Sequence, residues 1–489
     1  MSTIESLLPA ELWNERLFTG EWQVGSQPAT AVTEPASGLV LGHVANADAR
    51  TVATSAKTAS DAQKSWFALP HTERSKVFRN AALQCEKHFE EIVGWLIRES
   101  GSTRAKAEYE TTLTIQVLNE SSGLPSRSQG EVLPSTAGRL SMARRLPIGV
   151  VAVIAPFNFP LYLAIRSVAP ALALGNAVVL KPDPRTPVSG GFTIARFFEL
   201  AGLPKGLLHV LPGGVDVGAA LTSDPRIAMI QFTGSMGAGR KVGEAAGRNL
   251  KKVSLELGGK NSLIILDDAD LDLAVSNATW GTYLHQGQIC MAIGRILVQR
   301  GLYDQFLTRL VAKAKSLTVG DPSKGDFDLG PLINAHQRDH IHKLVSSAQN
   351  SGARLEAGGG YDALFFQPTV LSGVTAENPI FHEEVFGPVA VVVPFDTDEE
   401  AVRLANDTDF GLSGAVISND VGRALRLGEQ LRVGLLHIND QTANDEIVNP
   451  FGGYGASGNG TSVGGSASWE EFTQWQWFTL RDKAPMYPM

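Results

Sequence analysis

The sequence predicts an α/β protein with two parallel-sheet domains. Two successive stretches, residues 149–259 and 261–439, alternate short apolar segments of strand character with longer helical segments. Strands that alternate with helices in this way form parallel sheets covered by helices on both faces. A chain of 489 residues also exceeds what one hydrophobic core usually holds, which favours two or three domains.

A mostly helical region precedes these stretches, from residue 47 to about residue 115. Within it, Cys85, Trp95 and Leu96 recur at helical spacings, and Gly101 predicts the end of a helix. We therefore expect Cys85 to be a buried packing residue.

The two alternating stretches predict ten strands between them. In the first, we expect strands at 149–155, 176–182, 206–213, 226–235 and 251–259, with helices at 162–175, 189–202 and 236–250. In the second, we expect strands at 261–268, 295–299, 388–395, 413–418 and 434–439, with helices that include 271–283 and 303–317. The junction between the two domains falls near LELGGKNS, residues 255–262.

The end of the chain has a different character. In SWEEFTQWQWFTLRD, residues 468–482, Phe472, Gln474 and Gln476 alternate with Thr473, Trp475 and Trp477, which predicts a late aromatic strand. Such a strand leaves an exposed edge, and pairing with another subunit would cover that edge.

Composition excludes several classes of function. The 42 basic and 50 acidic side chains give a formal charge of −8, and no long basic block is present, so we expect no nucleic-acid partner. The most apolar run, residues 148–165, is broken by Pro156, Asn158 and Pro160, which argues against a membrane-spanning helix. Two cysteines and the absence of a signal-like start favour a soluble, cytoplasmic protein.

Three short motifs match known patterns in the wrong context. GYGASG (453–458) lacks the strand and helix that frame a dinucleotide fingerprint, and GTSVG (460–464) lacks those that frame a serine nucleophile. HQRDHIH (336–342) places two histidines on one helical face, without the glutamate of a zinc motif. We expect no metal site.

Two further motifs lie at the carboxyl ends of predicted strands, where open α/β sheets bind ligands. FTGSMGAG (232–239) opens a helix, so its backbone N–H groups and the Ser235 hydroxyl could meet a phosphate; a tight turn without a ligand is the alternative. Lys181 ends the strand 176–182, where a surface ion pair is the alternative.

Three residues together indicate nucleophilic catalysis. Cys290 lies among small and polar residues in LHQGQICMAIGR, where a lowered pKa would activate its thiol. Asn158 could donate a hydrogen bond to an oxyanion, and Glu256 could act as a general base. Packing, a turn and an ion pair are the respective alternatives, but they do not explain the combination.

At this point the sequence resembles the NAD(P)-dependent aldehyde dehydrogenase superfamily over essentially its whole length. The matching motifs occur in the family's order: APFNFP at 155, KPDPRTP at 181, FTGSMGAG at 232, LELGGKN at 255, GQIC at 287, EEVFGPV at 383 and NPFGGYGASG at 449.

The resemblance implies a role for each matched residue. Cys290 is similar to the nucleophile that attacks the aldehyde, Asn158 to the oxyanion donor and Glu256 to the base that activates water for thioester hydrolysis. The residues similar to cofactor contacts are Pro156, Lys181, Gly234, Ser235, Glu384 and Phe386.

The resemblance also implies a domain arrangement. The cofactor-binding domain, a Rossmann variant, would comprise residues 1–124 and 148–258, and the catalytic domain residues 259–465. A β-flap of residues 125–147 and 466–489 would form dimers, or tetramers made of dimers.

Departures from the family pattern affect the cofactor. Many NAD-preferring members carry a glutamate where this chain has Pro184, and its carboxylate would repel a 2′-phosphate. We therefore expect use of NAD with NADP tolerated. Phe157 and Gly455 replace a common tryptophan and a common lysine without affecting the chemistry.

The motifs KPDPRTPVSGG and GQICM look most like those of the benzaldehyde, vanillin and salicylaldehyde dehydrogenases. Aromatic and apolar side chains around Cys290 would form a slot for a planar ring. These side chains are Phe157, Phe159, Tyr162, Ile289 and Met291. Arg166 would donate to a ring substituent or stack on the ring, or else would form an ion pair.

Other functions compete with oxidation of an aromatic aldehyde to the acid. An aliphatic aldehyde or a semialdehyde is the first alternative, including release of the thioester to coenzyme A, against which Glu256 argues. A non-catalytic protein on the same fold is a more remote alternative, which Cys290, Glu256 and Asn158 together disfavour. We expect the Cys290 thiol to react faster than that of Cys85.

Overall fold

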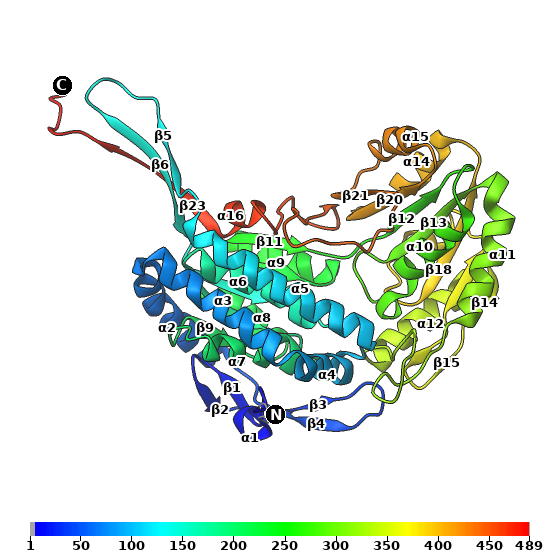
Figure 1. The fold of residues 1–489 in the computed structure, drawn as a ribbon, viewed down its shortest axis with the longest axis horizontal. Coiled ribbons are helices and arrows are strands. Elements are labelled where there is room, and N and C mark those ends of the chain that lie inside the picture. Colours follow the sequence, from blue (N-terminus) through cyan, green and yellow to red (C-terminus); the bar gives the residue numbers. More distant parts are fainter. Residues whose placement is uncertain (1–4, 489) are drawn as a thin grey trace.

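The computed structural model describes residues 5–488 and contains two α/β lobes and a projecting arm (Figure 1). The first lobe is built on a seven-stranded sheet, whose β7 to β11 are parallel and whose β1 and β2 are antiparallel. In spatial order the strands are β11 (Lys252–Glu256), β10 (Ile227–Thr233), β7 (Val150–Ile154), β8 (Ala177–Lys181), β9 (Leu208–Val210), β1 (Arg16–Phe18) and β2 (Trp22–Val24). The five parallel strands confirm the sequence prediction, whereas β1 and β2 precede the region that it covered.

Helices connect the parallel strands of the first sheet and pack on it. These are α6 (Pro160–Ala173), α7 (Thr193–Leu200), α8 (Val215–Ser223) and α9 (Met236–Arg248), with a π-helical turn at Val188–Phe192. The predicted helical region before them contains α2 (Ala49–Ala68), α3 (His71–Lys87), α4 (Phe89–Ser100) and α5 (Arg104–Gly123), after the short α1 (Ala10–Trp13). As predicted, Gly101 ends α4 in the left-handed conformation and Cys85 is fully buried, which raises its pKa to about 12.

The second lobe contains another seven-stranded sheet, in which only β14 is antiparallel to its neighbour. In spatial order its strands are β14 (Arg354–Ala357), β17 (Thr369–Ser372), β18 (Val389–Phe395), β13 (Ile293–Gln299), β12 (Asn261–Ile265), β20 (Ser413–Ile417) and β21 (Leu435–Ile438). Its helices are α10 (Leu271–Tyr283), α11 (Arg300–Ser316), α12 (Ala335–Asn350), α13 (Pro379–His382), α14 (Asp398–Asn406) and α15 (Val421–Gly428). The sequence did not predict β14 and β17.

Three small two-stranded sheets complete the lobes. They pair β3 (Thr30–Thr33) with β4 (Val40–Val44), β15 (Tyr361–Asp362) with β16 (Phe365–Phe366), and β19 (Phe410–Gly411) with β22 (Tyr454–Gly455). The chain crosses from the first sheet to the second between Glu256 and Asn261.

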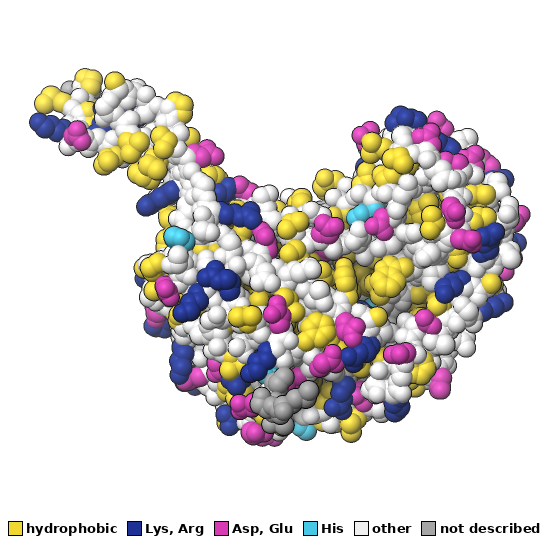
Figure 2. Space-filling view, in the orientation of Figure 1, with side chains coloured by type: hydrophobic (Ala, Val, Ile, Leu, Met, Phe, Trp, Pro, Cys, Tyr) yellow, Lys and Arg dark blue, Asp and Glu magenta, His cyan; other side chains and the backbone are white. Residues whose placement is uncertain are grey.

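The arm is a three-stranded antiparallel sheet that projects from the first lobe (Figure 1). It consists of β5 (Gly130–Leu133), β6 (Leu140–Pro147) and the C-terminal β23 (Thr473–Leu480). The predicted aromatic strand therefore begins at Thr473, and Phe472 instead ends the short helix α16 (Ala467–Phe472). Hydrophobic side chains are exposed along the arm (Figure 2), including Trp477, which is 64% exposed.

Within residues 5–488, no helix combines the length and the apolar character needed to cross a bilayer.

Candidate active site

Cys290 lies in a tight loop between a 3-10 turn (Leu284–Gly287) and β13, where it is partly exposed. The loop is shaped by three successive left-handed residues, His285 (φ 49°), Gln286 (φ 58°) and Gly287 (φ 67°). Glycine is required at the third position, because a Cβ there would lie 2.2 Å from the Gly387 carbonyl oxygen. The Gln286 amide, which donates to the carbonyls of Gly101 and Pro331, fixes this turn against two other segments.

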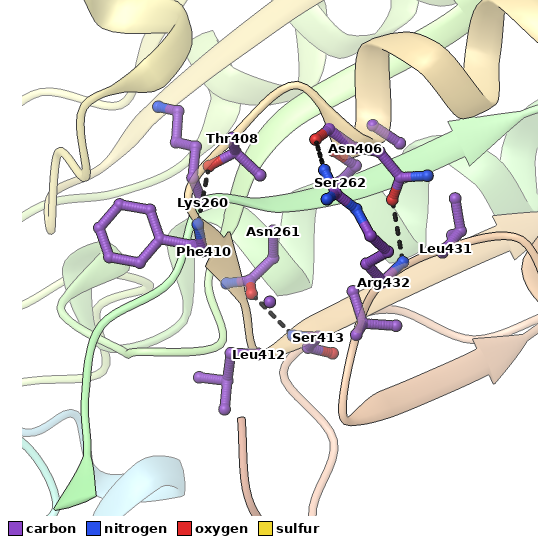
Figure 3. Close-up of a pocket in the computed structure, with 14 residues that line it drawn as sticks. Lys260, Asn261, Ser262, Asn406, Thr408, Phe410, Leu412, Ser413, Leu431 and Arg432 are labelled. Atoms are coloured by element: carbon purple, nitrogen blue, oxygen red, sulfur yellow. Dashed lines mark hydrogen bonds between the residues drawn. The ribbon is translucent and has the colours of Figure 1, made fainter. Parts of the chain in front are cut away.

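Asn261, at the start of β12, anchors the loop that carries Cys290. Its Nδ2 donates to the carbonyl oxygens of Cys290 (2.9 Å) and Ala292 (2.8 Å), and its Oδ1 accepts from the Ser413 N–H at 3.0 Å. Figure 3 shows this residue beside Ser413 in a hollow that is also lined by Lys260. The sequence did not single out Asn261; the available signal was an amide at the start of a predicted strand.

Glu256 ends β11 and is buried without a partner. Neither carboxylate oxygen forms a hydrogen bond within the described part of the chain. Burial raises the pKa of this carboxyl well above its usual range, Arg166 opposes the shift, and Glu471 and Asp445 add to it. An unpaired carboxyl of raised pKa is suited to accept a proton from water near neutral pH.

The glycine-rich loop near the C-terminus packs beside Glu256. Gly458 forms a β-bridge with Glu256, and the Leu257 N–H donates to the Ser457 carbonyl at 2.9 Å. The segment GYGASG therefore packs against the end of β11. This position agrees with the expectation that the segment is not a dinucleotide fingerprint.

Asn158 follows β7 and is held by a buried ion pair that the sequence did not reveal. Lys106 on α5 donates to the Asn158 carbonyl at 2.7 Å and forms an ion pair with Glu110 one turn away. Glu110 in turn accepts from the N–H groups of Leu161 (2.9 Å) and Tyr162 (3.1 Å), at the start of α6. Across residues 5–488 the Asn158 side-chain amide has no hydrogen-bond partner, so it is free to bind a substrate oxygen.

The electrostatics of Cys290 differ from the sequence expectation of a lowered pKa. Burial, together with the carboxyls of Glu384, Glu256 and Asp445, raises the pKa of the thiol to about 12, and Arg166 only partly opposes this. The ligand-free protein thus holds a protonated thiol at neutral pH.

Alkylation of Cys290 tests this directly. In the free protein, we expect its rate of reaction with iodoacetamide to rise about tenfold per pH unit between about pH 6 and pH 9, because the thiolate fraction does so below the pKa. Peptide mass spectrometry would follow Cys290, with the fully buried Cys85 as the unlabelled control. A plateau in rate within that range would contradict the raised pKa.

The glycine pair after Glu256 brings Glu384 to Cys290. The Gly259 N–H donates to Glu384 Oε1 at 3.1 Å, and a Cβ on Gly258 would lie 2.1 Å from Glu384 Oε2. A Cβ on Gly259 would lie 2.7 Å from the Cys290 carbonyl oxygen, so only glycines allow this close approach. Burial raises the pKa of Glu384 to about 7.

Aromatic rings line the adjoining space. Phe386, in the left-handed conformation (φ 51°), lies edge-on to Phe157 with ring centroids 5.9 Å apart. The Arg185 guanidinium covers Phe157 at 4.1 Å and is held by Asp183. Phe386 therefore lies next to Phe157, the residue that precedes Asn158.

Two further predicted residues lie at the carboxyl ends of strands of the first sheet, Lys181 on β8 and Ser235 just after β10. Lys181 is buried at the end of β8, and Asp183 and Asp216 partly offset the lowering of its pKa by burial. Ser235 caps α9, accepting from the Ala238 N–H at 3.4 Å. The Gly234 N–H, just before this helix, donates to the Glu256 carbonyl at 3.0 Å.

Residues 22–478 match the model of the aldehyde dehydrogenase family. The chain belongs to this family. It is 53% identical to a vanillin dehydrogenase of Amycolatopsis over 99% of this chain and 100% of that protein, and 47% identical to a benzaldehyde dehydrogenase [NAD(+)] of Pseudomonas putida over 98% of each. A solved betaine aldehyde dehydrogenase of Staphylococcus aureus in complex with NAD⁺ superposes with a TM-score of 0.94 at 32% identity, covering 98% of this chain and 97% of that one.

In this aldehyde dehydrogenase, the residues predicted to form a substrate slot lie in two groups. Phe157 adjoins Phe386, whereas the Phe159 ring lies 4.1 Å from Lys106 Nζ and 5.9 Å from the His285 ring. Tyr162, Ile289 and Met291 are buried in the same core cluster as Phe159. Pro156 is half-buried after β7.

Arg166 forms the ion pair that was one of its two expected roles. Its Nη1 lies 2.7 Å from Asp445 Oδ2, and both side chains are buried. Its guanidinium also covers the Phe451 ring at 4.1 Å. The sequence did not predict a role for Asp445, because nothing in its own segment marks it as the partner of a residue 279 positions away.

Proposed function

We propose that this protein oxidises an aromatic aldehyde to the carboxylic acid with NAD. The main support is full-length identity of 53% and 47% to proteins named vanillin dehydrogenase and benzaldehyde dehydrogenase [NAD(+)]. The second support is that Cys290, Glu256 and Asn158 all lie at strand ends or loops where the two sheets meet.

The first half of the proposed reaction uses Cys290 and Asn158. The Cys290 thiol gives its proton to solvent water and its sulfur bonds to the aldehyde carbon, whose C=O π electrons pass to the oxygen; the Asn158 amide donates to that oxygen as it becomes negative. The positive charge of Arg166 favours the thiolate. Bound NAD would supply the hydride acceptor for the former aldehyde carbon, and Cys290 would then carry the acyl group as a thioester.

The second half uses Glu256. Its ionised carboxylate takes a proton from water, the water oxygen bonds to the thioester carbon, and Cys290 leaves as the thiolate. The absence of a protein partner for Glu256 leaves room for that water on its carboxylate.

The chain offers a consistent set of groups for NAD. The half-buried Glu384 and Phe386 would hold its ribose and nicotinamide ends beside Cys290, and Lys181 its adenosine ribose. The two carboxyls near Lys181, those of Asp183 and Asp216, disfavour a 2′-phosphate. We infer NAD use with NADP accepted less well; a higher kcat/KM with NADP would overturn this.

Parallel assays of NADH formation test the proposed function. With benzaldehyde, vanillin, salicylaldehyde, hexanal and succinate semialdehyde, we expect the aromatic aldehydes to lead in kcat/KM by about tenfold or more, an advantage of about 1.4 kcal/mol in transition-state binding. A lead by hexanal or the semialdehyde would contradict the aromatic preference and leave the thiol chemistry standing.

We also propose that the arm joins subunits into a dimer, or a tetramer of dimers, in a cytoplasmic enzyme. Exposed Trp475, Trp477 and Val132 lie on it, and an exposed apolar surface of this kind is stabilised by burial against another chain. A monomer in sedimentation equilibrium would contradict the assembly, and export from the producing cell would contradict the location.

A further inference from the structure

Asp445 lies at the centre of a buried polar cluster beside the proposed site. It belongs to the loop after β21, and its Oδ2 accepts from Tyr162 Oη at 2.9 Å and from Arg166 Nη1 at 2.7 Å. Tyr162 and Arg166 are one turn apart on α6, so one carboxylate oxygen joins this helix to the loop.

The guanidinium of Arg166 is held on other sides as well. Its Nη2 donates to the Val463 carbonyl at 3.2 Å, and its plane covers the Phe451 ring at 4.1 Å. Its Nε is buried and has no hydrogen-bond partner within residues 5–488. The arginine therefore retains an unused donor and a full charge in a buried setting.

The glycine-rich segment links Arg166 to Glu256, a buried carboxyl without a hydrogen-bond partner in residues 5–488: its Val463 carbonyl accepts from Arg166, and its Gly458 forms a β-bridge with Glu256. No ion pair joins Arg166 to Glu256 in the described structure, yet Arg166 is the principal group that lowers the pKa of Glu256. A buried guanidinium and a buried carboxylate without a partner attract each other. In this structure the guanidinium is instead held by Asp445, Val463 and Phe451.

We propose that Asp445 is a positioning residue that prevents Arg166 from pairing with Glu256 and so keeps the base free for water. This inference rests on the proposed function, in which Glu256 activates the water that hydrolyses the thioester. Asp445 itself acts through Arg166 and touches neither substrate nor water in this role.

Asp445→Asn removes the charge and preserves the shape. Arg166 is then released toward Glu256, and we expect kcat to fall about tenfold or more at the hydrolysis step while one NADH per active site still forms in a rapid burst. The acid limb of the kcat–pH profile should move to lower pH.

The sign of that shift follows from the charges that face the two groups. Arg166 on α6 lowers the pKa of Glu256, whereas Glu471 on α16 and Asp445 raise it. The pKa of Cys290 is raised by Glu384, Glu256 and Asp445 and lowered by Arg166. Loss of the Asp445 charge therefore lowers both pKa values.

The double variant Arg166→Gln/Asp445→Asn distinguishes positioning from a merely structural role. With the arginine gone, nothing pairs with Glu256, so we expect the steady-state rate to recover to that of Arg166→Gln alone. Three results would each overturn the proposal. They are a double variant whose loss of rate is the sum of the losses in the single variants, an equal fall of burst and steady-state rates in Asp445→Asn, and an acid limb that does not move in Asp445→Asn.

Two further variants complete the test. Arg166→Gln alone should move the acid limb of the kcat–pH profile to higher pH, and this variant tests the proposal even if Asp445→Asn does not fold. As a control, Asp398→Asn removes one carboxylate from a part-exposed ion pair between Asp398 on α14 and Arg423 on α15, and it should leave the burst and the pH limb unchanged. If the unaltered protein shows no aldehyde oxidation, the proposed function itself has failed; if Glu256→Gln abolishes the burst, Glu256 acts before hydride transfer and the proposed role of Glu256 in hydrolysis alone has failed.

Discussion

Cys290→Ala is expected to lower kcat/KM for aldehyde oxidation by at least about 10⁴-fold, because the proposed covalent intermediate forms on the Cys290 sulfur. The thiol has no hydrogen bond in the described structure, so its loss leaves the loop anchored through Asn261 and Gln286. NAD binding, measured by calorimetry, should therefore persist.

Cys85→Ala is the matched control for this variant. Cys85 is equally a lone thiol, but it is fully buried on α3 and away from the two-sheet junction. We expect it to lower the melting temperature and to leave kcat unchanged. Activity that survives in Cys290→Ala would rule out the covalent mechanism.

Glu256→Gln should separate the two halves of the reaction. Steady-state kcat is expected to fall about 10²- to 10⁴-fold, the usual contribution of a general base, while the first turnover still releases one NADH per site. Rapid-quench mass spectrometry should then find the acyl group on Cys290. A proportional loss of the burst would show that Glu256 is needed before hydride transfer.

The pH dependence of the unaltered protein supports the same assignment. Since burial raises the pKa of Glu256, its ionised form is lost as the pH falls through that raised value. We expect the acid limb of the kcat profile to lie above the usual carboxyl range, and the limb should disappear in Glu256→Gln.

The sequence was sufficient for elements that carry a local pattern. Apolar runs between helical segments predicted the five parallel strands from β7 to β11, because each such strand is buried on both faces. Motifs at strand ends led to the prediction of Glu256 and Asn158, since the carboxyl ends of parallel strands share one edge, and small and polar neighbours led to that of Cys290; all three roles remain proposals.

The sequence did not reveal partners that are distant along the chain. Asn261 and Asp445 look ordinary in their own segments, and only folding brings Asp445 to Arg166. The pKa of Cys290 is a further case: it depends on burial and on three carboxyls from separate segments, so a motif that marks a reactive thiol does not fix its ionisation.

The crossing between the two sheets limits how this protein can be recombined with its relatives. In the few residues from Glu256 to Asn261, the chain ends one sheet, forms the glycine contacts with Glu384 and anchors the Cys290 loop. A chimaera that exchanges the first lobe to alter cofactor choice must cut within or beside this segment. Such a chimaera would bring in, together with the new cofactor contacts, the other parent's counterpart of Glu256 or of the partner of Arg166. We therefore expect activity in chimaeras whose residues 256–261 and 440–465 come from the same parent.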